Sequence, residues 1–595
     1  MNNNLFDEFK PVSTQEWLDK INKDLKGAPF DKLVWKTLHN FNLQPFYRQE
    51  DLKKLSYLDT IPGEFPYNRG NNLSHSWFIN ETVSDNDLLQ ANKTATELIK
   101  NGVTSLTFDN IKKTNFDVLL KNIDLSEIEI NFKVKNSNQI LSVLKALQKH
   151  NFTQIKGSFF CDNITETLFS DKTFSDEAKN NLLQAFKIIS DFKNYRLTTI
   201  NGINFCNAGT SATQEIAFIL SASVEYLNFF TDNSINATDI IKKLQFNLGI
   251  GSDYFIEIAK LRAIRFLWAK ISESYNIDKQ NAKIFIHSQT SDFNKTIYDK
   301  YVNILRTTTE AMSAIIGGTD SLNINNFDKN LPENPDFARR IAKNIQIIIK
   351  EESHFDKITD PSAGSYYIEN ITDNLIEKAW ELFLEIENQG GFLKAVKNNF
   401  IKNQIDKIQE IRKQNVETRK EIVLGTNQYP NLNEKIEKPE KIINEKSNGR
   451  IKKIRKSYKI EQIRLKTEKS KHTPKVFLFT YGNLALRKAR AMFATNFFGT
   501  AGFEIIDNQG FSDINTGIDA FNKSNSDLLI ICSSDDEYLK LATQISEKIN
   551  PKKIVIAGYP KDIINDLNKT GITNFIHVKS NLVSELTKYQ NQILN

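Results

Sequence analysis

The sequence predicts an α/β protein in which a (β/α)8 barrel of the TIM type precedes a smaller flavodoxin-like domain. A chain of 595 residues is too long for a single hydrophobic core. Between about residues 100 and 400, short apolar runs alternate with longer helical patterns, which is typical of parallel strands joined by helices. Periodicity alone leaves an open doubly wound sheet as an alternative, but about 300 residues of alternation favour a closed barrel.

The N-terminal segment, residues 1–75, is predicted to be a helical arm. Thr14–Ile21 is amphipathic, with Trp17, Leu18 and Ile21 on one face. Thr14 is the expected N-cap because its hydroxyl can accept a hydrogen bond from the first helical turn. The pattern therefore predicts a short capped helix ahead of the barrel.

The barrel is predicted to span residues 76–402. The clearest helix is Thr213–Leu227, where apolar residues recur at steps of three and four. The apolar runs that read as its buried strands are Val103–Phe108, Ile128–Phe132, Phe152–Cys161, Leu197–Cys206 and Ala282–His287.

Residues 403–474 are strongly charged and lack core-type runs, so a linker that is partly helical is expected there. Residues 475–595 return to alternation, and their apolar runs are separated by stretches long enough for a crossover helix. This pattern predicts a flavodoxin-like domain. Its expected strands are Val476–Thr480, Leu528–Cys532, Lys553–Ala557 and Asn574–Val578.

Composition excludes several classes of protein. No segment reaches the roughly 18 apolar residues of a membrane helix, and the first residues lack a secretory core, so a cytoplasmic location is expected. The net charge of +6 is spread over 595 residues, which argues against a nucleic-acid partner. Cys161, Cys206 and Cys532 stand alone, and no histidine pattern has metal-ligand spacing, so we expect reduced thiols and no metal site.

Two features allow a ligand-binding interpretation beside a structural one. The segment His287–Ser291 follows a predicted barrel strand, so it faces the functional side or forms a hydroxyl-rich turn. Arg262 and Arg265 share one helix face, where an anion site is conceivable and a structural salt bridge is favoured.

Several segments together resemble the adenosylcobalamin-dependent methylmalonyl-CoA mutase family. The most informative is Asp360–Glu369 (DPSAGSYYIE), which is followed by Ala379–Trp380 and Gly390–Phe392. The others, in the same order as in the family, are Leu58–Gly63, Tyr67–Gly70, Ile258–Ile271, His287–Ser291, Arg306–Met312, Gly318–Leu322 and Leu424–Tyr429. The resemblance implies the same barrel and small domain.

At the barrel the resemblance implies a site that has lost its chemistry. Where the family has an acidic imidazole, this sequence has Asn204, whose amide cannot titrate near neutral pH. A substrate-contacting Gln falls at Phe160, and two Arg positions fall at Lys243 and Asn80. No tyrosine lies between residues 68 and 81, where a Tyr close to the radical is expected.

The small domain departs from the family in the same direction. Leu486 takes the place of the histidine that ligates cobalt, and Leu484 takes the place of the aspartate that orients it. A Gly-Gly pair that makes room for the nucleotide tail of the cofactor reads Gly558–Tyr559. Ser533–Ser534 is retained, but Asp535 follows where an apolar residue is usual.

These departures imply a chain that resembles the small, non-catalytic subunit of a heterodimeric mutase. We therefore expect no catalytic, cofactor-binding or metal-binding residues in this chain, adenosylcobalamin on a homologous large subunit, and a role in assembly and stability. The alternatives are a divergent but active cobalamin-dependent mutase and a non-enzymatic homodimer that binds acyl-CoA, which the His287–Ser291 segment suggests.

Overall fold

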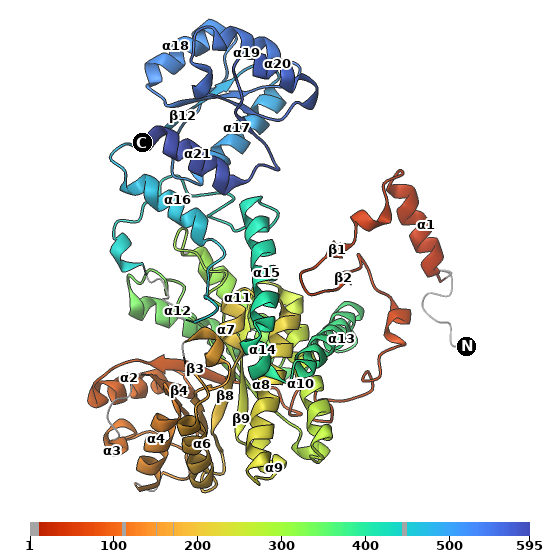
Figure 1. Ribbon diagram of the computed structural model, residues 1–595, viewed down its shortest axis with the longest axis vertical. Helices are drawn as coiled ribbons and strands as arrows, with labels where there is room; N and C mark the ends of the chain where they lie inside the picture. The colour runs from red at the N-terminus through yellow and green to blue at the C-terminus, as the bar shows by residue number, and fades with distance from the viewer. Residues whose placement is uncertain (1–10, 110–114, 150–151, 171, 443–448, 595) are drawn as a thin grey trace.

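The computed structural model describes residues 11–109, 115–149, 152–170, 172–442 and 449–594, and it confirms the predicted α/β fold (Figure 1). Its large parallel sheet has the strand order β7-β6-β5-β4-β3-β11-β10-β9-β8. The strands are β3 (Phe78–Val83), β4 (Ser105–Asp109), β5 (Glu129–Lys133), β6 (Gly157–Phe160), β7 (Tyr195–Arg196), β8 (Thr198–Asn201), β9 (Leu244–Ile250), β10 (Phe285–Thr290) and β11 (Ser321–Asn323).

The sheet closes into an eight-stranded barrel because its two end strands are halves of one segment. β7 and β8 are separated only by Leu197. β7 pairs with β6 and β8 pairs with β9, while the amide of Thr199 also donates to the carbonyl of Cys161 just after β6. β11 pairs with β3, so the chain returns to its first barrel strand.

Helices surround the barrel, and two of them are covered by a second layer. α8 and α10 are buried nearly all round, because α13 packs on the outside of both. The helices of this part are α2 (Leu88–Lys100), α3 (Phe116–Leu119), α4 (Ser137–Lys149), α5 (Glu166–Phe169), α6 (Asp176–Ile189), α7 (Gly202–Asn207), α8 (Ala212–Asp232), α9 (Ala237–Ile241), α10 (Tyr254–Ser274), α11 (Val302–Ile316), α12 (Pro335–Ile347), α13 (Tyr366–Asn388), α14 (Phe392–Lys397) and α15 (Phe400–Glu417).

Some predicted strand bounds were wrong. Only Thr198–Asn201 of the predicted strand Leu197–Cys206 is extended, because α7 begins at Gly202. β10 begins at Phe285 and continues to Thr290, so His287 lies within the strand and not at its end. The apolar runs also gave no indication of the barrel strands β3, β9 and β11.

Helix α1 (Thr14–Asp24), at the start of the N-terminal arm, stands away from the barrel (Figure 1). The later part of the arm packs on the barrel, with Phe41 and Leu43 in the barrel's hydrophobic core and His39 bonded to Ala212 and Thr213. This part carries a hairpin of β1 (Trp35–Lys36) and β2 (Asn42–Leu43). Ser13, not Thr14, is the N-cap of α1, because its hydroxyl accepts from the amide of Glu16 while the Glu16 carboxylate accepts from the amide of Ser13. α1 buries none of its residues.

The small domain is a five-stranded parallel sheet with the order β13-β12-β14-β15-β16, and it has a separate hydrophobic cluster on each face. Its elements, with helix α16 that leads into it, are α16 (Tyr458–Lys469), β12 (Lys475–Thr480), α17 (Leu484–Gly499), β13 (Glu504–Ile506), α18 (Ile514–Ser524), β14 (Leu528–Cys532), α19 (Tyr538–Ser546), β15 (Ile554–Ala557), α20 (Ile564–Lys569), β16 (Phe575–Ile576) and α21 (Leu582–Leu594). None of the helices in the described ranges is long and apolar enough to cross a membrane.

Candidate functional site

The interior of the barrel is polar, and its side chains hydrogen-bond to one another. The Asn80 amide on β3 donates to Ser105 at 2.8 Å and to Thr107 at 2.9 Å on β4. On the opposite side, the Gln245 amide on β9 donates to Ser158 and Thr199, both at 2.8 Å. Because these groups are buried, their pairing removes the free energy cost of desolvation without any ligand.

Arg196 adds a charge to this interior, and the charge is compensated locally. Its guanidinium pairs with the Glu129 carboxylate on β5 and donates to Gln245 Oε1 at 2.7 Å. It also lies 3.7 Å from the ring centroid of Phe285. The side chain therefore links β7 to β5, β9 and β10 inside the barrel.

His287 lies next to this network and is buried. Its Nδ1 is 3.0 Å from Ser321 Oγ, and its ring packs edge-on against Phe160 with a centroid distance of 4.8 Å. Burial, together with the positive charge of Arg196, lowers the pKa of His287 to about 3. The imidazole is therefore neutral near pH 7 and unable to act as a general acid.

Asn204 lies on α7 at the carboxyl ends of the barrel strands, where the family resemblance places the imidazole. Its amide donates to Glu166 Oε1 at 2.9 Å. Burial raises the pKa of Glu166 above its ordinary value. This pair is a side-chain contact within the protein, and the amide of Asn204 cannot deliver a proton.

The other substituted positions are spread over the barrel and do not form one site. Phe160 is at the carboxyl end of β6, and Asn80 is in the interior. Lys243 precedes β9, at the amino end of the strands, and its ammonium donates to the carbonyls of Phe192 at 2.7 Å and Tyr195 at 3.2 Å. Burial lowers the pKa of Lys243 to about 8.

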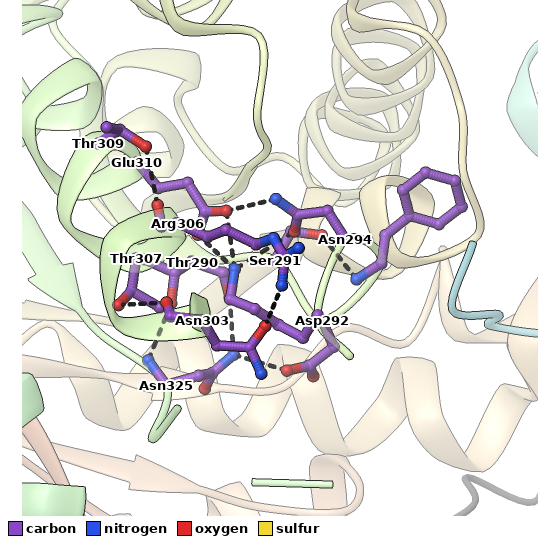
Figure 2. Close-up of polar contacts among 12 residues, drawn as sticks. Thr290, Ser291, Asp292, Asn294, Asn303, Arg306, Thr307, Thr309, Glu310 and Asn325 are labelled. Carbon is purple, nitrogen blue, oxygen red and sulfur yellow. Dashed lines mark hydrogen bonds and ion pairs between the residues drawn. The ribbon is translucent and has the colours of Figure 1, made fainter. Parts of the chain in front are cut away.

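The segment that follows β10 is held by its own contacts, as Figure 2 shows. Asn325 reaches back to the carbonyl of Thr290 at 2.6 Å and to Asp292 Oδ1 at 3.0 Å. The Glu310 carboxylate on α11 accepts from Asn294 at 2.5 Å and from Lys295 at 2.6 Å. These polar groups point toward one another, so their hydrogen-bonding capacity is used within the fold.

Within His287–Ser291 the remaining polar side chains are paired as well. Thr319 donates to Ser288 at 2.8 Å, Gln289 donates to Asn325 at 2.8 Å and Ser291 donates to Asn207 at 3.0 Å. The structural interpretation of this segment therefore accounts for its hydroxyl and amide groups.

Residues 449–457 of the charged segment run across the carboxyl end of the barrel. The amide of Ile451 donates to the carbonyl of Leu168, that of Ile454 to Asn207 and that of Lys456 to Phe293, at 3.3, 2.9 and 2.8 Å. These acceptors follow β6, β8 and β10. The segment thus joins three loops of the face on which barrel enzymes build active sites.

A polar cavity of about 410 Å³ lies beside this face, between the arm and α15. Its wall includes Glu215 and Glu257, whose carboxylates lie 2.8 and 2.6 Å from the ammonium of Lys260. Burial raises the pKa of Glu215, and the lysine opposes that rise. Sequence reasoning missed this triad, although charged residues within the apolar helices α8 and α10 were a usable signal.

The segment Asp360–Glu369 contributes to a buried ion cluster behind the barrel. Arg262 on α10 pairs with Asp360 and, at 2.8 Å, with Glu369. Arg69 lies 3.9 Å from Asp360 and 3.8 Å from Glu369. The favoured salt-bridge interpretation of Arg262 is confirmed, and Arg265 likewise lies 3.3 Å from Asp320.

A family model described as methylmalonyl-CoA mutase matches residues 108–473. The chain belongs to the methylmalonyl-CoA mutase family. It is 41% identical to a "Methylmalonyl-CoA mutase small subunit" of Porphyromonas gingivalis, over 99% of this chain and 98% of the relative. A Streptomyces virginiae protein with the same description is 27% identical over 93% of both chains, and an Escherichia coli "Methylmalonyl-CoA mutase" is 28% identical over 70% of this chain and 64% of its own length.

In this mutase-family chain, the small domain has a crevice where its strand order reverses, between β12 and β14. The carboxylate of Glu537 lies in it and accepts from Ser533 and, at 2.9 Å, from Ser534. A Cβ atom on Gly482 would collide with this carboxylate. The two retained serines therefore have a partner within the domain.

The residues at the positions of the cobalt ligand and the Gly-Gly pair are on the surface. Leu484 and Leu486, in the first turn of α17, are 54% and 46% exposed. Tyr559, which follows β15, is 46% exposed and packs against His577 with a centroid distance of 4.8 Å. Neither leucine carries a lone pair, and the tyrosine ring stands beside the carboxyl ends of the strands.

Proposed function

We propose that this chain is the small subunit of a heterodimeric, adenosylcobalamin-dependent methylmalonyl-CoA mutase, and that it is itself non-catalytic. The complex would convert methylmalonyl-CoA to succinyl-CoA. The observation that carries this proposal is the barrel interior, where Asn80, Arg196 and Gln245 bond to neighbouring side chains. The names of the two full-length relatives support the same assignment.

The residues of the small domain do not fit cobalamin. Leu486 stands where the resemblance places the histidine ligand, and a leucine side chain cannot bind cobalt. Glu537 already accepts from Ser533 and Ser534, and Tyr559 replaces the second glycine of the expected pair. We therefore assign the cofactor to the partner large subunit and no catalytic, cofactor-binding or metal-binding residue to this chain.

The N-terminal arm supports the proposed role in assembly. Trp17 on α1 is 48% exposed and Trp35 on β1 is 51% exposed, and Val12 and Leu33 are exposed as well. Large apolar side chains that are exposed on the arm cost free energy in water (Figure 1). A homologous barrel seated against the arm would bury them.

The proposal keeps the predicted division of the chain into an arm (1–75), a barrel (76–402), a linker (403–474) and a small domain (475–595). It also keeps the predicted cytoplasmic location. Fractionation of cells that express the tagged chain, followed by immunoblotting, would test the location.

Co-expression with a homologous large subunit tests the central proposal. We expect a one-to-one complex by sizing, with cobalamin and turnover present in the complex and absent from this chain purified alone. A matched complex in which the large subunit lacks its cobalt-ligating histidine should lose both. Replacing Leu486 in this chain by Ala should leave both unchanged.

The alternatives predict different outcomes. Stoichiometric retention of adenosylcobalamin by this chain alone, with turnover, would identify a divergent active mutase. A stable homodimer that does not exchange with the large subunit and binds acyl-CoA would favour the non-enzymatic homodimer, which the His287–Ser291 segment suggested.

A further inference from the structure

A second cavity, of about 350 Å³, lies between the barrel and the small domain. It is bounded by α15, α16, the loop after β10 and the first turn of α21. The apolar side chains in its wall are Phe293, Val416, Ile454, Ile460 and Val583. None of the positions at which the resemblance implies lost chemistry contributes to this wall, so the cavity is separate from the degenerate sites.

Arg412 forms the most polar part of the wall. Its Nε donates to the carbonyl of Gly209 at 2.9 Å and its Nη2 to that of Thr210 at 3.3 Å, and its guanidinium lies 5.4 Å from the ring centroid of Phe293. Within the described ranges, no carboxylate lies at ion-pair distance from Arg412. The backbone carbonyls hold the guanidinium in place. Beyond ion-pair distance it shares the Glu421 carboxylate with Lys456, because burial acts to raise the pKa of Glu421 and both positive charges lower it.

The lysines around the cavity differ from Arg412 because each has an acidic partner at ion-pair distance. Lys413 lies 2.9 Å from Glu410, and Lys459 lies 3.2 Å from Glu417. Lys456 lies 3.0 Å from Glu421. Burial lowers the pKa of Lys456, and its Glu421 partner opposes that shift.

Arg455 provides a second donor at the cavity. Its Nη1 lies 2.6 Å from the Glu461 carboxylate, while its buried Nη2 has no hydrogen-bond partner. An apolar chamber with Arg412 and Arg455 in its wall therefore matches an amphiphile with an anionic head.

We propose that this cavity binds a monocarboxylate with a short apolar chain. The carboxylate would pair with the guanidinium of Arg412, and the chain would pack against Val416, Ile460 and Val583. A cavity of about 150 Å³ is enough to hold benzene, so about 350 Å³ accommodates an eight-carbon acid. The site does not depend on cobalamin or on a partner subunit.

The position of the cavity gives such a ligand a structural consequence. Val416 is on α15 and Phe293 follows barrel strand β10, whereas Val583 belongs to the small domain. A bound acid therefore contacts both halves of the molecule. Because it binds only the folded arrangement, it should raise the midpoint of thermal unfolding with increasing ligand concentration.

Calorimetric titration of the full chain with octanoate tests the ligand class. We expect saturable one-to-one binding with a dissociation constant below about 1 mM. Octan-1-ol and octylamine carry the same chain without the negative charge, and each should bind at least about 10-fold more weakly, which corresponds to about 1.4 kcal/mol. Octanol binding as tightly as octanoate would overturn the assignment of an anion site.

Two pairs of variants locate the binding. Arg412→Gln should weaken the binding of octanoate at least about 10-fold. Arg340→Gln, on the exposed surface of α12, should leave that affinity unchanged. Val583→Trp should fill the cavity and abolish binding, whereas Val578→Trp at an exposed position should retain it.

Because Val583→Trp can also disturb folding, its far-ultraviolet circular dichroism is compared with that of the parent. The comparison of octanoate with octan-1-ol and octylamine, and the Arg412→Gln variant, test the proposal even if Val583→Trp does not fold. Absence of saturable octanoate binding to the parent chain, or unchanged binding in Arg412→Gln, would overturn the proposal.

Discussion

The barrel interior and the N-terminal arm differ in the burial and bonding of their side chains. In the interior, Asn80, Arg196 and Gln245 are buried or nearly so and bonded to neighbours. On the arm, Trp17 and Trp35 are about half exposed, and α1 buries nothing. These three interior side chains therefore have partners within the protein, whereas the arm exposes apolar area that another molecule could cover.

This difference separates two functions that an enzyme subunit usually combines. A substrate site needs polar groups that stay available, and the barrel of this chain offers few of them. An assembly surface needs apolar area that stays accessible, and the arm offers it. This contrast is what we expect of the proposed non-catalytic subunit.

Removing Arg262 should give the largest loss of stability, because it breaks the buried ion cluster behind the barrel. Arg262→Ala leaves Asp360 and Glu369 without their main partner, and we expect a loss of about 3–5 kcal/mol in the free energy of unfolding. Urea unfolding followed by tryptophan fluorescence measures it. The exposed control Arg340→Ala should change stability by less than about 0.5 kcal/mol, and a similar value for Arg262→Ala would contradict the cluster's role.

Acidification should destabilise the interior through His287. Its folded pKa of about 3 lies below the ordinary value of 6.5, so its contribution to stability is complete above pH 6.5 and is lost as the pH falls toward 3. The slope is at most about 1.4 kcal/mol per pH unit. His287→Gln should flatten the dependence of the unfolding free energy on pH, and the exposed His472→Gln should not. Equal slopes in both variants would exclude His287 as the cause.

Opening the small-domain crevice should have a modest effect. Glu537→Ala removes the acceptor of Ser533 and Ser534, and we expect a loss of about 1 kcal/mol, because Ser533 still donates to the carbonyl of Tyr481 at 2.9 Å. Thermal unfolding measures this loss against the exposed control Glu547→Ala. Equilibrium dialysis should show no cobalamin binding by Glu537→Ala, since Leu486 remains, and tight binding would refute the assignment of Leu486.

Changes on the arm should have the smallest effect on the isolated chain. Trp17→Ser with Trp35→Ser should alter its unfolding free energy by less than about 1 kcal/mol, because about half of each ring is already exposed in the isolated chain. The same pair should weaken association with the large subunit at least about 10-fold in a biolayer measurement. Unchanged association would show that the arm is not part of the proposed interface.

Four of the five small-domain strands could be predicted from the sequence, whereas the edge strand β13 and three barrel strands could not. Leu528–Cys532 has the predicted bounds because both faces of β14 are covered by apolar clusters. β3 and β11 carry Asn80, Ser321 and Asn323 toward a polar interior, so neither has a continuous apolar run. Sequence patterns that assume an apolar barrel core miss such strands.

The positions that depart from the family pattern could be identified from the sequence, but the residues that they contact could not. That Asn204 and Leu486 cannot do the work of histidine follows from their side chains alone. Asn204 donates a hydrogen bond to Glu166, and Ser534 donates one to Glu537. Both contacts depend on the tertiary fold and cannot be inferred from the side chains alone. Lys243 shows the limit most clearly, since only the structure places its ammonium at the amino end of the barrel.

The sequence by itself determined the family, the order of barrel and small domain, and the loss of titratable groups at particular positions. These conclusions follow from residue identity and local periodicity, which need no long-range contacts. The tertiary structure alone decided that polar side chains in the barrel interior bond to one another, that residues 449–457 cross its carboxyl end and that no carboxylate among the described residues lies at ion-pair distance from Arg412. The reason is physical, because burial and charge pairing are set by segments far apart in the chain.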